Sequence, residues 1–120
     1  MKETNFSITN KTRGKVPRVF FEKIKDAVVG KNYSLSLVFI GETTSQKLNK
    51  QYRQKDKATN VLSFPLTENS GEIFITPKVA KKEGHSVGFL FIHGLLHLKG
   101  YDHGDTMERA EEKIRKQFGV

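Results

Sequence analysis

The sequence contains no cysteine. This absence excludes a disulfide-stabilised scaffold and a thiolate zinc site, so any transition-metal ligands must be nitrogen or oxygen atoms. The chain also lacks an apolar stretch long enough to cross a bilayer or to act as a signal sequence, and it has no internal repeat or low-complexity segment. We therefore expect a cytoplasmic protein that is not bound to a membrane.

Acidic residues are scarce relative to basic ones. The 120 residues include 13 Asp and Glu against 21 Lys and Arg, which gives a formal net charge of +8. A chain of this length can form one domain with a core of modest size, and we expect a single domain over residues 1–120. Such a basic surface favours a polyanionic partner, above all a nucleic acid, over a surface whose charge serves solubility alone.

Three of the four histidines stand in one short stretch, in the pattern H-x-x-x-H-x-x-G-x-x-H. If residues 87–98 form a helix, His93 and His97 lie one turn apart on the same face. Gly100 can then take the left-handed conformation that reverses the chain and brings His103 back toward them. We predict that these three imidazoles bind one metal ion per chain. The alternative is that they are core and surface histidines with no shared role.

The same spacing occurs in the metzincin metalloproteases, where a glutamate directly after the first histidine acts as general base. Here that position is Gly94, which can neither accept nor donate a proton. The sequence therefore predicts a protease-like metal cage without the protease's base. A peptide hydrolase remains an alternative, which Gly94 and the basic composition both disfavour.

Hydrophobic periodicity predicts both strands and helices. Alternating apolar residues indicate strands over 6–9, 34–39, 61–64 and 72–75; the third is expected to end at Pro65 and to pair with the fourth as a hairpin. Helices are expected from the turn that contains Pro17 to Gly30, over 43–53, from 76 or 77 to 84, from 86 or 87 to 98, and over 105–118. The helix over 87–98 is apolar on every side, so we expect it at the centre of the domain.

Finer expectations concern caps and burial. Capping boxes are predicted at Thr43 with Gln46 and at Asp105 with Glu108. Two sets of apolar side chains are expected to be buried: Leu48 and Tyr52 on the inner side of the second helix, and the aromatic residues Phe20, Phe21, Phe89 and Phe91 in the core.

The densest positive stretch lies between residues 47 and 57, where Asp56 is the only acidic residue. Its basic residues could hold a phosphate backbone. For Lys47 and Lys50, a solvated helix face is the better interpretation. The basic residues of the stretch are Lys47, Lys50, Arg53, Lys55 and Lys57.

Together these residues resemble a known family. The segment from His93 to His103 is similar to the H-G-x-L-H-L-x-G-Y-D-H signature of the YbeY family, the endoribonucleases of bacterial ribosomal RNA maturation. Residues 48–65 resemble the second characteristic block of that family, and residues 71–73 resemble its G-D-I strand. Met107 and Glu111 resemble the methionine and glutamate of its last helix.

The resemblance implies an α+β domain with a mixed sheet, Zn²⁺ bound by the three histidines, and cleavage of single-stranded RNA. It further implies a role at the 3′ end of 16S ribosomal RNA, contact with the small ribosomal subunit, and a part in ribosome quality control. The family's important arginine corresponds to Arg53, which can clamp the scissile phosphate, with Lys55 and Lys57 as further substrate-binding residues. The nucleophile is either water activated by the metal or the ribose 2′-hydroxyl. We expect a monomer.

Two further points follow from the site. Ligating histidines usually hydrogen-bond through their second ring nitrogen, and Tyr101 and Asp102 are candidate partners beside the third ligand.

A ribosome-assembly or RNA-binding factor with a mainly structural zinc is the main alternative function. Three histidines that leave a fourth coordination position open argue against it, because structural zinc sites are usually closed.

Overall fold

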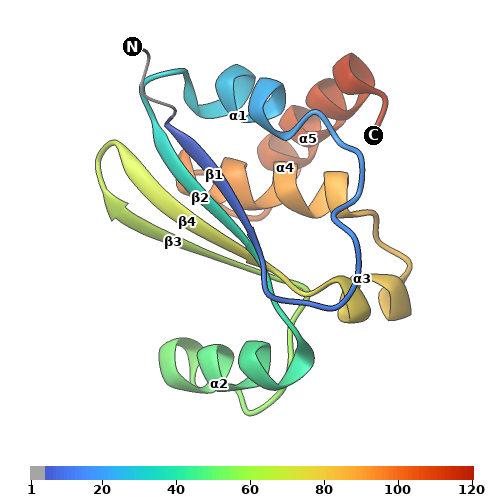
Figure 1. Cartoon of the computed structure of the whole chain (residues 1–120). Helices are drawn as coiled ribbons and strands as arrows, with labels where there is room; N and C mark the ends of the chain where they lie inside the picture. Colours follow the sequence, from blue (N-terminus) through green and yellow to red (C-terminus); the bar gives the residue numbers. More distant parts are fainter. Residues whose placement is uncertain (1–4) are drawn as a thin grey trace.

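A four-stranded mixed β-sheet organises the chain in the computed structural model, which describes residues 5–120 (Figure 1). Its strands are β1 (Phe6–Asn10), β2 (Ser34–Phe39), β3 (Val61–Thr67) and β4 (Ser70–Ile75), in the order β1-β2-β4-β3. The pairs β1–β2 and β2–β4 are parallel, whereas β3 and β4 form an antiparallel hairpin. The predicted α+β class, mixed sheet and hairpin are therefore confirmed.

The hairpin is longer than the sequence predicted. Pro65 was expected to end its strand, but β3 continues to Thr67 with an irregular register between Pro65 and Thr67. The reason is the position of β3 at the edge of the sheet, where the missing N–H of a proline need not interrupt a ladder on both sides.

In the described part of the chain, five helices accompany the sheet: α1 (Phe21–Val29), α2 (Glu42–Arg53), α3 (Pro77–Glu83), α4 (Val87–Leu98) and α5 (Asp105–Phe118). Helices α1, α4 and α5 lie on one side of the sheet, and α4 lies between β3 and β4 on one side and α1 and α5 on the other (Figure 1). The central position predicted for the helix over 87–98 is thus confirmed. The Ser86 hydroxyl caps this helix by accepting a hydrogen bond from the backbone N–H of Phe89.

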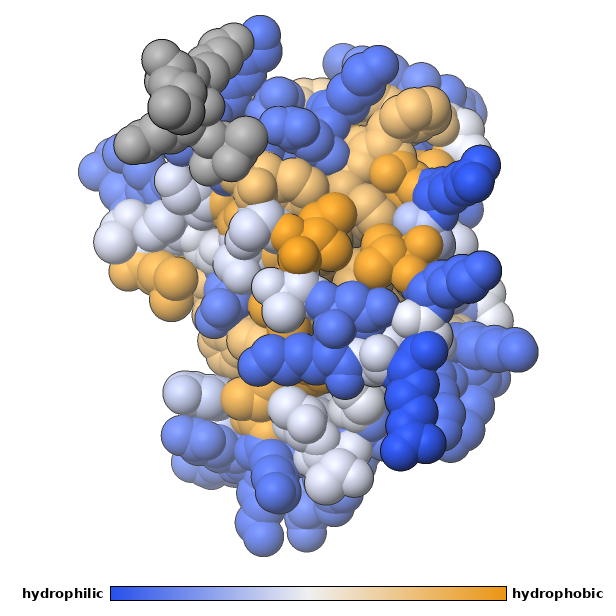
Figure 2. Space-filling model, viewed as in Figure 1, coloured by the Kyte–Doolittle hydropathy of each residue, from blue (hydrophilic) through white to orange (hydrophobic). Residues whose placement is uncertain are grey.

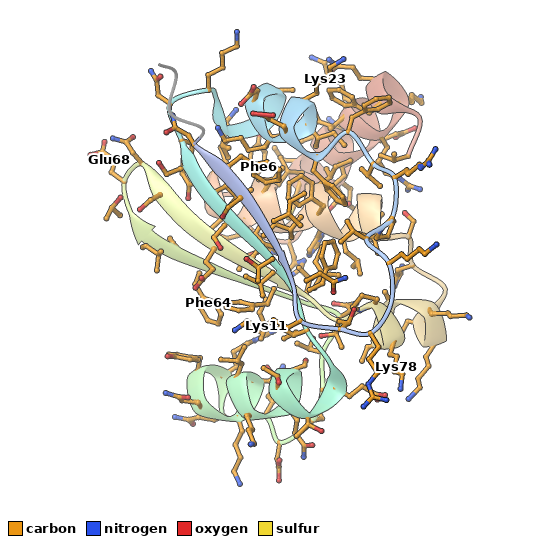
Figure 3. All side chains as sticks on the ribbon, in the orientation of Figure 1. Phe6, Lys11, Lys23, Phe64, Glu68 and Lys78 are labelled. Carbon is orange, nitrogen blue, oxygen red and sulfur yellow. The ribbon has the colours of Figure 1, made fainter. Side chains whose placement is uncertain are left out.

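The core fills the space between α4 and the sheet. Phe91 and Leu95 of α4 are buried there, together with Leu37 and Ile73 from the two central strands. Side chains from the edge strand also enter this layer: Phe6 packs 6.3 Å from Phe91, measured between ring centroids (Figure 3). Burial of the other sides of α4 fixes the position of the two histidines that it carries.

Several finer expectations were wrong. Helix α1 begins at Phe21 and not near Pro17, and Phe20, expected in the core, is 64% exposed because it precedes the helix. The two capping boxes are also absent: Gly41 and Gly104 are the N-cap residues of α2 and α5, and neither helix has a side-chain cap.

Helix α2 stands apart from the helical layer, near the bottom of Figure 1. Its buried side chains are Ser45 and Asn49, not Leu48 and Tyr52 as predicted. The Ser45 hydroxyl hydrogen-bonds both the N–H and the C=O of Thr59, and the Asn49 amide donates to the carbonyl of Lys57. Polar contacts with the following loop therefore orient α2, and Tyr52 is left 58% exposed.

Hydrophilic side chains cover much of the surface seen in Figure 2. Figure 2 shows hydrophilic side chains over α2 in the lower part of this face, and apolar surface in its middle. Within residues 5–120, none of the helices combines the length and apolar character that crossing a membrane requires.

Candidate metal centre

The first two histidines of the motif lie on the cleft side of α4. His93 and His97 are one turn apart, their ring centroids are 4.6 Å apart, and their Nε2 atoms are 3.1 Å apart. Both rings are partly buried because the rest of α4 is enclosed by the core. The two imidazoles therefore converge as their spacing predicted.

The third histidine returns to them from the loop after α4. Gly100 takes φ +105°, in the left-handed region, and the N–H of Tyr101 bonds the carbonyl of Leu96 as the chain reverses. This turn places the ring of His103 5.2 Å from that of His93 and 4.7 Å from that of His97, between centroids. The role predicted for Gly100 in the turn is confirmed.

The donor set fits a metal ion. One nitrogen from each of the three histidines lies within 4.8 Å of the others. Nitrogen ligands of tetrahedral zinc are bound at about 2.0–2.1 Å, so two of them stand roughly 3.3 Å apart. The 3.1 Å between the Nε2 atoms of His93 and His97 is close to that spacing. His93, His97 and His103 could therefore hold one ion with small adjustments of the third ring.

The second nitrogen of two rings is already engaged. Glu111 of α5 places its carboxylate Oε1 2.5 Å from Nδ1 of His93. Nδ1 of His97 lies 3.1 Å from the backbone carbonyl of Tyr101. A carboxylate and a carbonyl can only accept here, so both rings carry the proton on Nδ1 and turn an unprotonated Nε2 to the centre. This is the tautomer that a metal ion requires.

The electrostatic environment also favours the ligating form. Burial, and next the neighbouring His93, hold the pKa of His97 below its usual value of 6.5, while the hydrogen bond to the carbonyl of Tyr101 acts in the opposite direction. Because only neutral imidazole binds a metal, a lowered pKa keeps the His97 ring available near neutral pH.

Sequence reasoning missed the role of Glu111. It placed the partner of a ligating histidine at Tyr101 or Asp102; Tyr101 does take part, through its backbone carbonyl, whereas Asp102 is exposed. A signal was nevertheless present in the sequence. Glu111 lies one turn after Met107 in the apolar stripe of the last helix, and both residues are buried. A carboxylate on a buried stripe needs a polar partner, and here that partner is a histidine.

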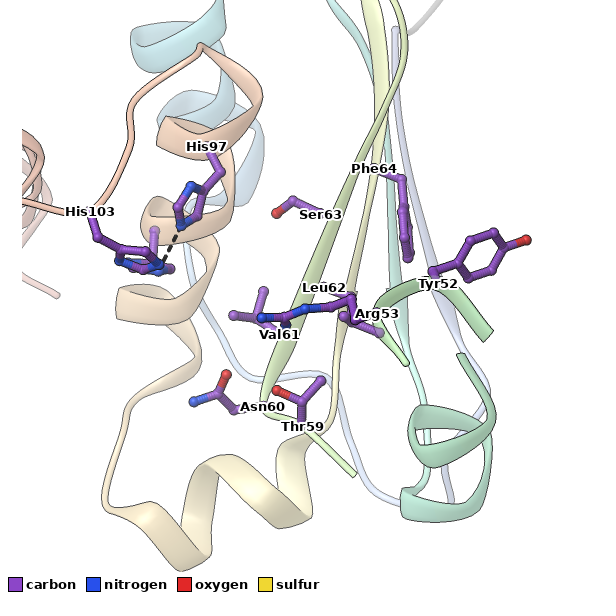
Figure 4. A pocket seen from close by; sticks show the side chains of 11 residues that line it. Tyr52, Arg53, Thr59, Asn60, Val61, Leu62, Ser63, Phe64, His97 and His103 are labelled. Carbon is purple, nitrogen blue, oxygen red and sulfur yellow. Dashed lines mark hydrogen bonds between the residues drawn. The ribbon is translucent and has the colours of Figure 1, made fainter. Parts of the chain in front are cut away.

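A cleft of about 650 Å³ opens beside the histidines. It runs over the outer edge of β3, and Figure 4 shows Arg53 extending from the end of α2 toward the side of β3 where His97 and His103 lie. The predicted residues Lys55 and Lys57 are exposed in the next loop but do not line the cleft. The lining residues are Tyr52, Arg53, Thr59, Asn60, Val61, Leu62, Ser63, Phe64, His93, His97 and His103.

Gly94 permits close packing of α4 against β3 and β4. A Cβ atom at this position would stand 2.9 Å from Oγ of Ser63 and 3.1 Å from Cδ1 of Ile73. The Ser63 hydroxyl also donates a hydrogen bond to the Gly94 carbonyl, at 3.1 Å. A glutamate at this point, as in a metzincin, would require the side chains of Ser63 and Ile73 to shift.

Fold and site together define a small α+β protein whose three-histidine site, suited to one metal ion, faces a cleft with an arginine on its other side. A family model described as "Endoribonuclease YbeY" matches residues 1–119 of the sequence. The chain therefore belongs to the endoribonuclease YbeY family, a family of RNA-cleaving hydrolases, and the family predicted from the sequence is confirmed.

Individual relatives agree with this assignment. The endoribonuclease YbeY of Staphylococcus carnosus strain TM300 is 40% identical over 118 residues, which cover 82% of this chain and 71% of the relative. The endoribonuclease YbeY of Limosilactobacillus reuteri strain DSM 20016 is 34% identical over 147 residues, which cover 93% of this chain and 91% of the relative. A solution structure of a Thermotoga maritima protein has a TM-score of 0.61 at 26% identity and covers 95% of this chain and 89% of that one.

Proposed function

We propose that this protein is a zinc-dependent endoribonuclease specific for single-stranded RNA. Its substrate is ribosomal RNA in the small ribosomal subunit, with processing of the 3′ end of 16S ribosomal RNA as its main step and ribosome quality control as a second task, both in the cytoplasm. One Zn²⁺ per chain is held by His93, His97 and His103. Membership of the YbeY family supports the reaction class.

The observation that carries the proposal is the sharing of one cleft by three histidines and an arginine. The donor set of three imidazoles suits zinc, and Arg53 supplies a cation for the phosphate of the substrate. No acidic side chain of residues 5–120 pairs with Arg53, so its guanidinium is available to an external anion. This combination fits a phosphodiester better than a peptide bond.

When bound, zinc supplies a Lewis acid that polarises a phosphoryl oxygen or lowers the pKa of water toward ~7. The guanidinium of Arg53 holds two oxygens of the scissile phosphate and stabilises the negative charge that builds up on them. Glu111 holds the ring of His93 and keeps its proton on Nδ1. Lys55 and Lys57, exposed after α2, attract the flanking phosphates.

The cleft provides no carboxylate to act as base, since none of its lining residues is Asp or Glu. The nucleophile is then either water or the ribose 2′-hydroxyl of the substrate itself. The ends of the products distinguish the two: a 2′,3′-cyclic phosphate identifies attack by the 2′-hydroxyl, whereas a linear phosphate formed directly identifies attack by water.

A ribosome-assembly factor with a structural zinc is the rival proposal. His103 is exposed and the histidines face an open cleft, whereas structural zinc sites are closed and four-coordinate. These features favour a site that admits a substrate.

The test compares the zinc-loaded native protein with His97→Ala and Arg53→Ala on a labelled single-stranded RNA and on its duplex. We expect the native protein to cleave the single strand alone. His97→Ala should contain no zinc and cleave neither RNA. Arg53→Ala should keep its full zinc content but cleave at least about a hundredfold more slowly, as expected for the loss of one charge-stabilising group. His85→Ala and Arg13→Ala are the matched controls, because both side chains lie outside the cleft.

Tight RNA binding without cleavage by the native protein would favour the assembly factor. Equal cleavage by the native and Arg53→Ala proteins would remove Arg53 from the mechanism. The same assay with a labelled small-subunit precursor that carries an extended 16S 3′ end tests whether ribosomal RNA is the substrate.

A further inference from the structure

Tyr52 is an aromatic side chain left exposed beside the cleft. It is one residue before Arg53 at the end of α2, and 58% of its surface is accessible to solvent. Consecutive helical residues point about 100° apart. Arg53 accordingly extends toward the histidine side of β3, whereas Tyr52 lies beyond the opposite side of this strand (Figure 4).

A second aromatic ring backs Tyr52. Phe64 of β3 lies 5.0 Å from it between centroids, at an interplanar angle of 59°. Phe64 in turn packs edge-on against Phe74 of β4, at 5.8 Å and 72°, so its position is fixed by the sheet. Figure 3 shows Phe64 on the side of the sheet where α2 lies. The pair thus forms a supported aromatic surface that still leaves more than half of Tyr52 uncovered.

The edge strand connects this surface to the metal centre. Residues from both faces of β3 line one cleft, because within residues 5–120 no strand pairs with the outer edge of β3. Ser63 lies on the histidine side of the strand and Phe64 on the tyrosine side (Figure 4). A chain that crosses the edge of β3 would therefore meet the histidines, then the guanidinium of Arg53, then the aromatic pair.

We propose that Tyr52, supported by Phe64, stacks on an unpaired base of the RNA next to the phosphate held by Arg53. This inference rests on the proposed function and adds a base-binding subsite to it. Aromatic side chains stack on any base, so the subsite is tolerant of sequence. In a duplex both faces of a base are covered by its neighbours, and the subsite therefore contributes to the preference for single strands.

The competing explanation is that Tyr52 only packs α2 against the sheet. Two substitutions separate the roles: Tyr52→Phe keeps the ring, and Tyr52→Leu keeps apolar bulk but removes the flat aromatic face. Phe20→Leu is the matched control, since Phe20 is similarly exposed, at 64%, and lies away from the cleft. Zinc content and the denaturant midpoint establish that each variant is folded and loaded.

The readout is kcat/KM for cleavage of a single-stranded RNA and of a series of the same RNA with one abasic nucleotide at each position in turn. We expect Tyr52→Leu to lower kcat/KM by about fivefold to a hundredfold, the range for one stacked base, with Tyr52→Phe and Phe20→Leu close to native. In the native protein, one abasic position near the cleavage site should cause a similar loss. In Tyr52→Leu that same position should cause almost none.

The outcomes are distinct. In one outcome, the native and Tyr52→Leu proteins cleave the intact RNA equally well and lose the same kcat/KM at each abasic position. That result would overturn the subsite and leave the endoribonuclease function intact. In another, Tyr52→Leu loses kcat/KM because it is less stable, while the dependence of kcat/KM on the abasic position stays as in the native protein. That result would likewise leave Tyr52 with a packing role alone. A native protein that cleaves no RNA would overturn the subsite together with the proposed function.

Discussion

Glu111 provides the sharpest test of the metal centre. It is the one carboxylate of residues 5–120 that contacts a predicted ligand, through the 2.5 Å contact between its Oε1 and Nδ1 of His93. Its removal in Glu111→Ala frees the imidazole to rotate and to move its proton to Nε2, where it blocks the metal. Loss of such a supporting group typically lowers metal affinity by about tenfold to a hundredfold, or roughly 1.4–2.7 kcal/mol.

Glu111→Gln refines the expectation. The amide oxygen of glutamine can still accept the hydrogen bond from Nδ1, but the negative charge is lost. Hydrogen bonds to charged groups contribute about 1.5–3 kcal/mol, against about 0.5–1.5 kcal/mol for neutral pairs. We therefore expect Glu111→Gln to bind zinc more weakly than the native protein and Glu111→Ala to bind it more weakly still.

Zinc affinity is measured by competition with a chromophoric chelator, on proteins whose circular dichroism spectrum matches that of the native chain. Glu108→Ala is the matched control, since Glu108 lies on the same helix with an exposed side chain. The reasoning is refuted if folded Glu111→Ala binds zinc as tightly as the native protein does.

Three further predictions concern the same architecture. Gly94→Val should lower the free energy of unfolding by about 1–3 kcal/mol in denaturant titrations, because its Cβ would stand 2.9 Å from Ser63 Oγ. Gly14→Val is the control: its Cβ would make only an ordinary contact at 3.8 Å, so the free energy of unfolding should change by less than about 0.5 kcal/mol. Phe91→Ala should cost about 3–5 kcal/mol in the same titrations because Phe91 is fully buried, and equal stability of this variant and the native protein would contradict the core described above. Free zinc at a hundred times its Kd should raise the free energy of unfolding of the native protein by about 2.7 kcal/mol. The effect should be seen as a higher melting temperature that a chelator reverses. An equal gain in His97→Ala would show that the zinc binds elsewhere.

The metal motif was predictable because its geometry is local. The spacing of His93 and His97 needs only the helical repeat, and the return of His103 needs only a residue at position 100 that accepts a positive φ. The apolar sequence around the two helical histidines likewise implied a helix at the centre of the domain. None of these steps depended on which other segment would pack against α4.

The orientation of α2 was not predictable in the same way. An apolar pattern pointed to Leu48 and Tyr52 as its inner face, but Ser45 and Asn49 are buried instead. The deciding contacts are hydrogen bonds to the loop at residues 57–59, which lies close only once the chain has folded. The same limit applies to Glu111, because its partner is on another helix.

Gly94 links the packing of the core to the chemistry of the site. The glycine that permits this close packing also leaves no side-chain base directly after His93, and none of the residues that line the cleft is Asp or Glu. In the proposed reaction, proton transfer and charge stabilisation are then left to a bound metal, the substrate and Arg53. Arg53 reaches the cleft because β3 is an edge strand, open on the side where α2 ends. The placement of α2 by polar contacts is therefore as necessary for the proposed reaction as the histidine motif itself.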